Sequence, residues 1–155
     1  APQAVRAAAQ RTDLRALVES IAMDYADAGM PVQVLHAVDG ICDTRLQALR
    51  RLLCNLVENA LKFAGSAELV LDRQGAQGPW SVRVLDHGPG IPQAELAAVL
   101  QPYVRLEDSR NRGTGGTGLG LAIANELAQA LGGRLVLGPR EDGGEGLDAR
   151  VELPG

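Results

Sequence analysis

Two periods of hydrophobic and polar positions divide the chain into expected helices and strands. Apolar residues recurring every three or four positions indicate helices that each bury one side. Residues with cap and stop chemistry bracket these stretches: Asp13 before the first, Asp43 or Thr44 opening the second, and Gly65 ending it. The pattern predicts helices at residues 14–28, 43–65, 92–100 and 118–131.

Strict alternation of apolar and polar residues marks the expected strands. It predicts strands at residues 32–38, 67–72, 80–86, 134–138 and 147–153. A turn at Gly75–Pro79 makes the second and third of these a hairpin, and a glycine- and acid-rich turn joins the last two. Helices and hairpins therefore interleave without strict alternation, which predicts an α+β fold with one sheet covered on one face by helices.

Two segments show neither period. Residues 1–12 are rich in alanine and glutamine and are interpreted as a linker remnant, so the domain is expected to comprise residues 13–155. Residues 101–117 combine charge and glycine, and we expect them to form a mobile loop.

Composition narrows the class of protein. With 155 residues, 46% hydrophobic and 22% charged, the chain has the composition of one globular domain. A net charge of -4 without a basic stripe argues against nucleic-acid binding. No apolar run approaches the length that crosses a bilayer, so no direct membrane contact is expected of this domain. Cys42 and Cys54 lack the spacing of metal ligands, which favours a reducing, cytoplasmic setting.

The long helix predicted at 43–65 carries an unusual polar face. At about 100° per residue, Asn55, Asn59 and Lys62 lie close together with Glu58 beside them. The opposite face is apolar: Leu46, Leu49, Leu53, Leu56, Val57 and Ala60. Amide and carboxylate oxygens suit Mg²⁺, and a lysine suits phosphate. A plain solvated face is the alternative interpretation.

The heptapeptide DHGPGIP, residues 86–92, follows an apolar strand directly. A carboxylate at a strand end, followed by two glycines, offers an acceptor beside open backbone. Asp86 could accept a hydrogen bond from an exocyclic amine such as that of adenine. The alternative is an ordinary turn, since Asp-x-Gly and Pro-Gly are common turn formers.

The stretch GTGGTGLGLAI, residues 113–123, places many glycines directly before a predicted helix. The free N–H groups at a helix N-terminus bind phosphate, and glycines allow close approach. Gly113, Gly115 and Gly118 formally match the dinucleotide fingerprint, with Glu141 at a suitable distance. That fingerprint needs a buried strand just before it, and RLEDSRNR is not one.

Taken in order, NLVENALKF, DHGPGIP and GTGGTGLGLAI resemble the N box and the two glycine boxes of the GHKL ATPase/kinase superfamily. The form GTGLGLAIA, followed by a helix and LGG, is most similar to the catalytic ATP-binding domain of bacterial sensor histidine kinases. PYVRLEDSR resembles that family's F box, with Tyr103 where phenylalanine is commoner. The resemblance runs from Leu14 to Leu153. It implies the Bergerat fold, a two-layer α/β sandwich whose mixed, mostly antiparallel sheet lies under about three helices, with a flexible ATP lid.

The resemblance implies roles position by position. Asn59 would coordinate Mg²⁺ and Glu58 would assist the acceptor histidine, so that Glu58, Asn59 and Arg105 form the catalytic set. Asp86 would read the adenine amine, and Lys62 and Arg105 would meet phosphates. The full ATP-binding set implied is Asn55, Asn59, Lys62, Asp86, Gly88, Gly90, Ile91, Tyr103, Arg105, Gly116, Thr117, Gly118, Leu119 and Gly120.

The implied activity is transfer of the γ-phosphoryl group of ATP, with Mg²⁺, to a histidine on a separate dimerisation domain. A response regulator receiver domain is the expected next partner, and the full-length protein is expected to be anchored in a bacterial inner membrane. Two departures stand out. His87 replaces the usual asparagine, and neither His36 nor His87 has the sequence setting of the acceptor.

Three other functions stay open at this point: a serine-directed kinase of the same superfamily, an ATP-driven machine, and a degenerate nucleotide-binding module. Nucleotide titration with and without Mg²⁺ separates the degenerate module from the others. Transfer to a histidine-bearing hairpin separates a histidine kinase from a machine.

Overall fold

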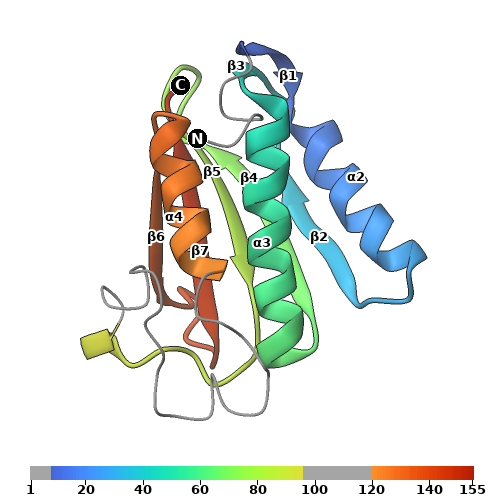
Figure 1. Cartoon of the computed structure of the whole chain (residues 1–155), viewed down its shortest axis with the longest axis vertical. Coiled ribbons are helices and arrows are strands. Elements are labelled where there is room, and N and C mark those ends of the chain that lie inside the picture. The colour runs from blue at the N-terminus through green and yellow to red at the C-terminus, as the bar shows by residue number, and fades with distance from the viewer. Residues whose placement is uncertain (1–7, 96–119) are drawn as a thin grey trace.

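A five-stranded sheet and a layer of helices make up most of the described chain, and a short two-stranded sheet adds to them (Figure 1). The computed structural model describes residues 8–95 and 120–155. Its five-stranded sheet has the order β2-β4-β5-β7-β6, in which only β2 and β4 run parallel. The strands are β2 (Val32–Ala37), β4 (Ala67–Arg73), β5 (Trp80–Leu85), β6 (Arg134–Pro139) and β7 (Leu147–Leu153). The predicted two-layer α/β sandwich and both predicted hairpins are confirmed.

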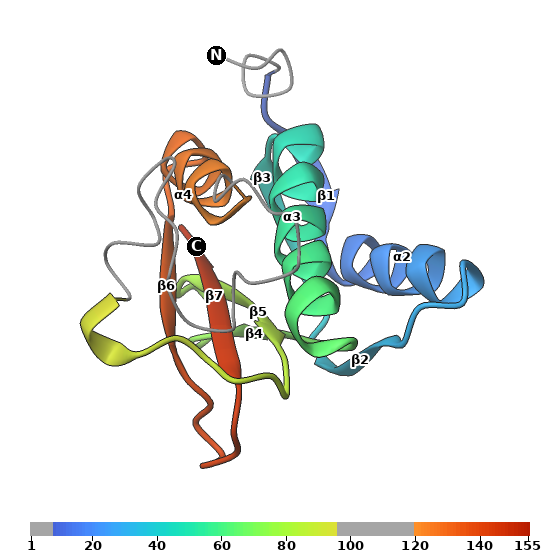
Figure 2. The ribbon, with the colours of Figure 1, turned by 60° about the horizontal axis from the view of Figure 1, so that its bottom comes forward.

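Three helices cover one face of this sheet, and Figure 2 shows them side by side above it. They are α2 (Leu14–Asp27), α3 (Leu46–Ala64) and α4 (Gly120–Ala130). Asp13 caps α2 as predicted, because its Oδ1 accepts the N–H of Ala16 at 3.0 Å. Gly65 ends α3 in the left-handed conformation, with φ of 78°, which glycine adopts without steric cost. None of the helices in the described ranges is long and apolar enough to span a bilayer.

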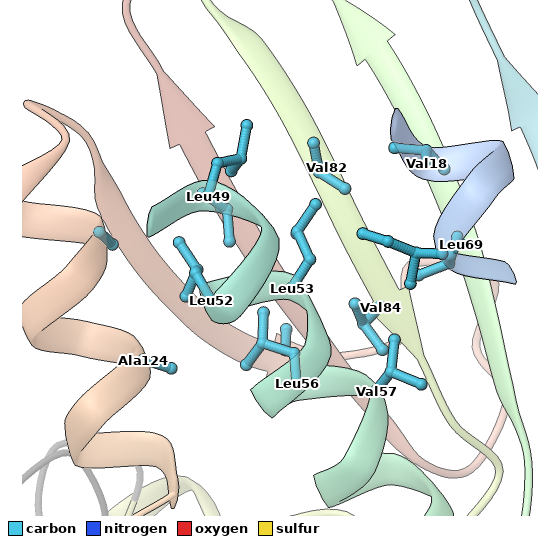
Figure 3. Close-up of a cluster of buried hydrophobic side chains, with 14 of the residues drawn as sticks. Val18, Leu49, Leu52, Leu53, Leu56, Val57, Leu69, Val82, Val84 and Ala124 are labelled. Carbon is cyan, nitrogen blue, oxygen red and sulfur yellow. The ribbon is translucent and has the colours of Figure 1, made fainter. Parts of the chain in front are cut away.

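Aliphatic side chains fill the space between the two layers (Figure 3). The apolar face predicted for the long helix is buried, except that Leu46 at its start is only half-buried. Leu49 and Val57 of α3 lie in the same cluster as Val18 of α2, Val82 of β5 and Ala124 of α4. This single core fixes the position of α3 above the sheet.

The sequence interpretation missed two short strands. Residues 10–12, predicted as linker, belong to β1 (Gln10–Asp13), which pairs antiparallel with β3 (Ile41–Thr44). The prediction that Asp43 or Thr44 opens the long helix is therefore wrong. Their backbone is engaged in the β1–β3 ladder, so α3 begins at Leu46 without a side-chain cap. Four-residue strands carry too few residues to show a period.

Helices α3 and α4 run antiparallel. The guanidinium of Arg45, just before α3, donates to the carbonyl of Ala130 at the end of α4 (3.2 Å). The end of α3, the start of α4, the chain leaving β5 and the β6–β7 loop thus gather at one end of the molecule, the lower end in Figure 1. A 3₁₀ turn at Gln93–Glu95 is the described part of the helix predicted at 92–100. The predicted loop at 101–117 lies outside the described residues.

Candidate functional site

Asp86 lies at the end of β5 and is held from several directions. Its side chain is buried, with the residue only 2% exposed. The carboxylate Oδ1 accepts the N–H of Gly88 at 2.9 Å and the N–H of Leu147 at 3.1 Å. Its own N–H donates to the carbonyl of Leu147 at 3.1 Å. Hydrogen bonds from backbone N–H groups to an ionised carboxylate are strong, so the Asp86 carboxylate is fixed in orientation.

The glycines after Asp86 let the chain pass close to α3. A Cβ atom on Gly88 would lie 3.0 Å from the Cβ of Ala64 and 3.2 Å from the carbonyl oxygen of Phe63. Gly90 is buried and has φ of 73°, a conformation that favours glycine. Ile91 follows, half-buried against the core. The predicted acceptor beside open backbone is thus found where the last turn of α3 meets the end of β5.

The β6–β7 loop closes over Asp86 from the other side. A Cβ atom on Gly146, whose φ is 129°, would lie 1.9 Å from the carbonyl oxygen of Asp86. Arg140 is buried, and its guanidinium donates to that same carbonyl oxygen at 3.2 Å. Hydrogen bonds from Arg140 and from the N–H of Gly144 lower the pKa of the Asp142 carboxyl to about 2. Hydrogen bonding to Asp142 in turn raises the pKa of Arg140, so the pair stays ionised across the neutral range.

The polar face of α3 divides between two sides of the helix. In Figure 3, Leu52 points toward Ala124 of α4. Asn59 lies seven residues further along the same stripe, and Asn55 lies one turn before it. Both asparagines are half-buried, and Lys62 is exposed in the last turn. The two amides therefore lie on the side of α3 that faces α4.

Glu58 is turned the other way, toward α2. The hydroxyl of Tyr25 donates to its Oε2 at 2.8 Å. Burial, and to a smaller extent the hydrogen bond to Glu58, raise the pKa of Tyr25. The hydroxyl therefore stays protonated and acts as a donor. The contact fixes an exposed carboxylate on the outer surface, about 100° around the helix from Asn59.

The first residue of α4, Gly120, is exposed at the same end of the molecule as Asp86. The N-terminus of a helix carries unpaired N–H groups and a partial positive charge, which bind anions. The remaining predicted members of the site lie outside the described residues: Tyr103, Arg105, Gly116, Thr117, Gly118 and Leu119.

Two residues weighed from the sequence lie away from this site. His36 is exposed on β2, an edge strand of the five-stranded sheet. Glu141, the acidic residue of the competing dinucleotide fingerprint, forms ion pairs with Arg83 (3.5 Å) and Arg150. These contacts place Glu141 over the sheet strands β5 and β7, where it serves the ion-pair network of the sheet.

Sequence reasoning missed the residues that hold Asp86 in place. Arg140 and Leu147 are 54 and 61 positions away from it in the chain. The one signal available was glycine at position 146 immediately before a strand, where a close backbone approach is common. A lone arginine after a strand carries no comparable pattern.

The fold and this arrangement define a class of protein. Residues 44–155 match the family described as histidine kinase-, DNA gyrase B- and HSP90-like ATPase, and the chain belongs to that family. It is an ATP-binding domain with the two-layer fold that the sequence resemblance implied.

Particular relatives are sensor kinases. The chain is 42% identical over 111 residues to the sensor protein TorS of Escherichia coli, which covers 69% of this chain and 12% of TorS. It is 37% identical over 147 residues to the sensor histidine kinase GtrS of Pseudomonas aeruginosa, covering 94% of this chain and 29% of GtrS. The chain thus spans less than a third of either relative.

A solved structure with the same fold is the ATP-binding domain of PrrB from Mycobacterium tuberculosis. It superposes with a TM-score of 0.76 at 23% identity, covering 96% of this chain and 98% of that domain. At this identity the likeness establishes the shared fold.

Alanine at Gly146 is expected to damage both stability and ATP binding. The added Cβ would meet the Asp86 carbonyl at 1.9 Å in a strained conformation, which we expect to cost about 2 kcal/mol or more of unfolding free energy. Gly143→Ala is the matched control, because Gly143 also has positive φ (78°) but its Cβ would meet nothing within 4 Å. Denaturant unfolding and ATP calorimetry of both variants measure the difference; equal losses in the two would show that contact with Asp86 is unimportant.

Proposed function

We propose that this chain binds ATP together with Mg²⁺ and delivers the γ-phosphoryl group to a histidine on a separate dimerisation domain of the same sensor kinase. The phosphoryl group would pass from there to the receiver domain of a response regulator. The membership in the ATPase family and the sensor-kinase relatives support this reading. In such a protein the present domain works in the cytoplasm, and the full-length kinase is anchored in the inner membrane.

The observation that carries the proposal is the buried, fixed carboxylate of Asp86. A carboxylate that accepts two backbone N–H groups on one oxygen cannot rotate freely, so it presents a defined acceptor direction. The exocyclic amine of adenine is a donor that fits such an acceptor. Gly88 and Gly90 let the loop pack closely against α3 and the β6–β7 loop beside this carboxylate, and Ile91 would be an apolar neighbour of the base.

Metal and phosphate groups fit the neighbouring donor set. Asn59 would supply an amide oxygen to Mg²⁺, with Asn55 beside it, and amide oxygens are suitable ligands for this hard cation. When bound, Mg²⁺ neutralises phosphate charge that would otherwise oppose phosphoryl transfer. Lys62 and Arg105 would contact phosphates. Backbone N–H groups of Gly116, Gly118, Leu119 and Gly120 would close the phosphate side, and Thr117 and Tyr103 would complete the ATP-binding set.

The chain's own contribution to catalysis would be positioning. Phosphoryl transfer requires the acceptor in line with the γ-phosphate and little covalent work by the protein. Glu58 would assist the acceptor imidazole as a nearby acid or base. Its hydrogen bond to Tyr25 supports this role, because it already holds the carboxylate on the exposed side of α3.

Alanine at Asn59 is expected to remove the Mg²⁺ dependence of ATP binding more than the binding itself. The amide is proposed as a metal ligand, whereas the adenine contact lies at Asp86. Calorimetric titration of ATP should show that Mg²⁺ increases the ATP affinity of the unaltered chain. In the variant this increase should be about tenfold smaller, because roughly one charge-assisted contact is lost.

Gln47→Ala is the control for this experiment, because Gln47 is exposed on the first turn of the same helix. It should leave both titrations unchanged. Full Mg²⁺ enhancement in Asn59→Ala would make Asn59 an ordinary surface residue. Absence of ATP binding in the unaltered chain would favour a degenerate module.

A further inference from the structure

Arg140 is a buried cation behind the nucleotide site, at the end of β6. Only 6% of its side chain is exposed. One terminal nitrogen of the guanidinium lies 3.2 Å from the Glu68 Oε1 on β4 and 3.2 Å from the carbonyl oxygen of Asp86. The other terminal nitrogen and Nε donate to the carboxylate of Asp142, the shortest contact being 2.8 Å. One planar group thus joins β4, the end of β5 and the β6–β7 loop.

Stability alone does not account for such an arrangement. Taking a charged pair out of water costs free energy that its attraction only partly returns, and apolar replacements of buried pairs are often neutral or stabilising. What the guanidinium supplies that an apolar side chain cannot is direction. Its rigid fork fixes several acceptors at once in one plane.

The acceptor that matters is the Asp86 carbonyl. Leu147 engages the Asp86 N–H and Oδ1, and the N–H of Gly88 also donates to Oδ1. Arg140 in addition donates a hydrogen bond to the Asp86 carbonyl oxygen. The N–H, the carbonyl and the side chain of Asp86 are therefore all held by hydrogen bonds. A rotation of this peptide unit would swing the carboxylate away from its direction.

Glu68 links the next residue of the loop to the same cluster. Its Oε1, which accepts from Arg140, also lies 3.2 Å from the Nε2 of His87. His87 stands where the sequence resemblance led us to expect asparagine. Arg140 and Glu68 therefore contact two consecutive residues of the loop, Asp86 and His87.

We infer that Arg140 is a positioning residue for adenine recognition: it fixes the Asp86 peptide so that the carboxylate meets the exocyclic amine of the base. This inference rests on the proposed function, in which Asp86 binds that amine. Arg140 does not touch the nucleotide in this assignment and acts only through Asp86.

The test compares two nucleotides in the unaltered chain and in Arg140→Met. Inosine diphosphate carries a carbonyl oxygen where adenosine diphosphate carries the amine, and its ring N1 carries a proton that N1 of adenine lacks. The ribose and the diphosphate of the two nucleotides are the same. In Arg140→Met the affinity for ADP should fall about tenfold, while the affinity for IDP should change less than twofold. NMR titration reaches the weak IDP binding, and thermal unfolding confirms that the variant is folded.

Two further variants frame the result. Arg134→Met is the matched control, since Arg134 is 71% exposed and pairs with Glu152 on the same sheet; it should change neither affinity. Arg140→Lys keeps the charge without the fork, so it should restore less than half of the lost preference for ADP. If Arg140→Met does not fold, the lysine variant and Glu68→Gln are measured in the same way, with the same expected narrowing of the ADP-to-IDP preference.

An equal loss of ADP and IDP affinity would overturn the inference, because Arg140 would then support the fold in general. ADP affinity within twofold of the unaltered chain would overturn it as well. Asp86→Asn is titrated in parallel to tell the two levels apart. If that variant loses ADP binding and folded Arg140→Met does not, only the role of Arg140 fails; if Asp86→Asn binds ADP normally, the proposed adenine contact itself fails.

Discussion

Asparagine at position 86 is expected to reduce adenine nucleotide binding to a small fraction of its original strength. The N–H groups of Gly88 and Leu147 both point at the Oδ1 position, so the amide oxygen of the variant must occupy it. The amide NH₂ then takes the other position and presents a donor to the amine of adenine, which is also a donor. Two buried donors that face each other without an acceptor cost about 1–3 kcal/mol. The dissociation constant for ADP should therefore increase by a factor of about five to more than one hundred.

Calorimetric titration with ADP checks this expectation, and the unfolding midpoint checks that the variant stays folded. Asp27→Asn provides the control, because Asp27 is an exposed carboxylate at the end of α2 and its change should have no effect. ADP affinity within twofold of the unaltered chain would remove Asp86 from the nucleotide site. The near-isosteric change keeps the fold intact because it preserves both hydrogen bonds to Oδ1.

The second large effect concerns phosphoryl transfer. Incubated alone with γ-labelled ATP, this chain is expected to bind the nucleotide and gain no phosphohistidine. Transfer needs an imidazole in line with the γ-phosphate at about 3 Å. The chain has two histidines. His36 lies on an edge strand, and His87 lies beside Glu68, directly after the residue that is proposed to hold the base.

A separate helical hairpin that carries its cognate histidine should become labelled when it is added. The transfer should be weak, because no linker raises the local concentration of the acceptor. The same hairpin with glutamine in place of histidine is the control and should stay unlabelled. Acid-labile label on His36 or His87 of the chain itself would contradict both the assigned orientation of the nucleotide and the proposed division of labour.

Periodicity alone was enough to place the long elements. The apolar stripe of α3 and the alternation in β4, β5 and β7 reflect burial of one face, and each spans enough residues to reveal its period. Asp13 was recognised as a cap because capping is a local hydrogen bond between residues three apart. Burial of one face and local hydrogen bonding both depend on residues that are close together in the sequence, so both can be recognised from a short segment.

The β1–β3 pair could not be found by the same reasoning. Gln10–Asp13 and Ile41–Thr44 form a ladder only because the chain between them returns through α2 and β2. Read locally, Asp43 and Thr44 have the chemistry of a helix cap, and the pairing of their backbone overrides that preference. A strand of four residues is identified by its partner, and the partner is distant in sequence.

The nucleotide site shows the same division. The sequence by itself determined which residues are proposed to carry the chemistry: the amides of α3, the carboxylate of Asp86 and the glycines that follow it, since each proposal depends on residue type within one short segment. Only the tertiary structure decided how they are aimed. It turns Asn59 toward α4 and Glu58 toward α2, and it brings Leu147 and Arg140 onto Asp86 across 61 and 54 residues of chain. The reason is physical: contacts that fix orientation come from other strands and helices, and their partners are set by the packing of the whole sheet.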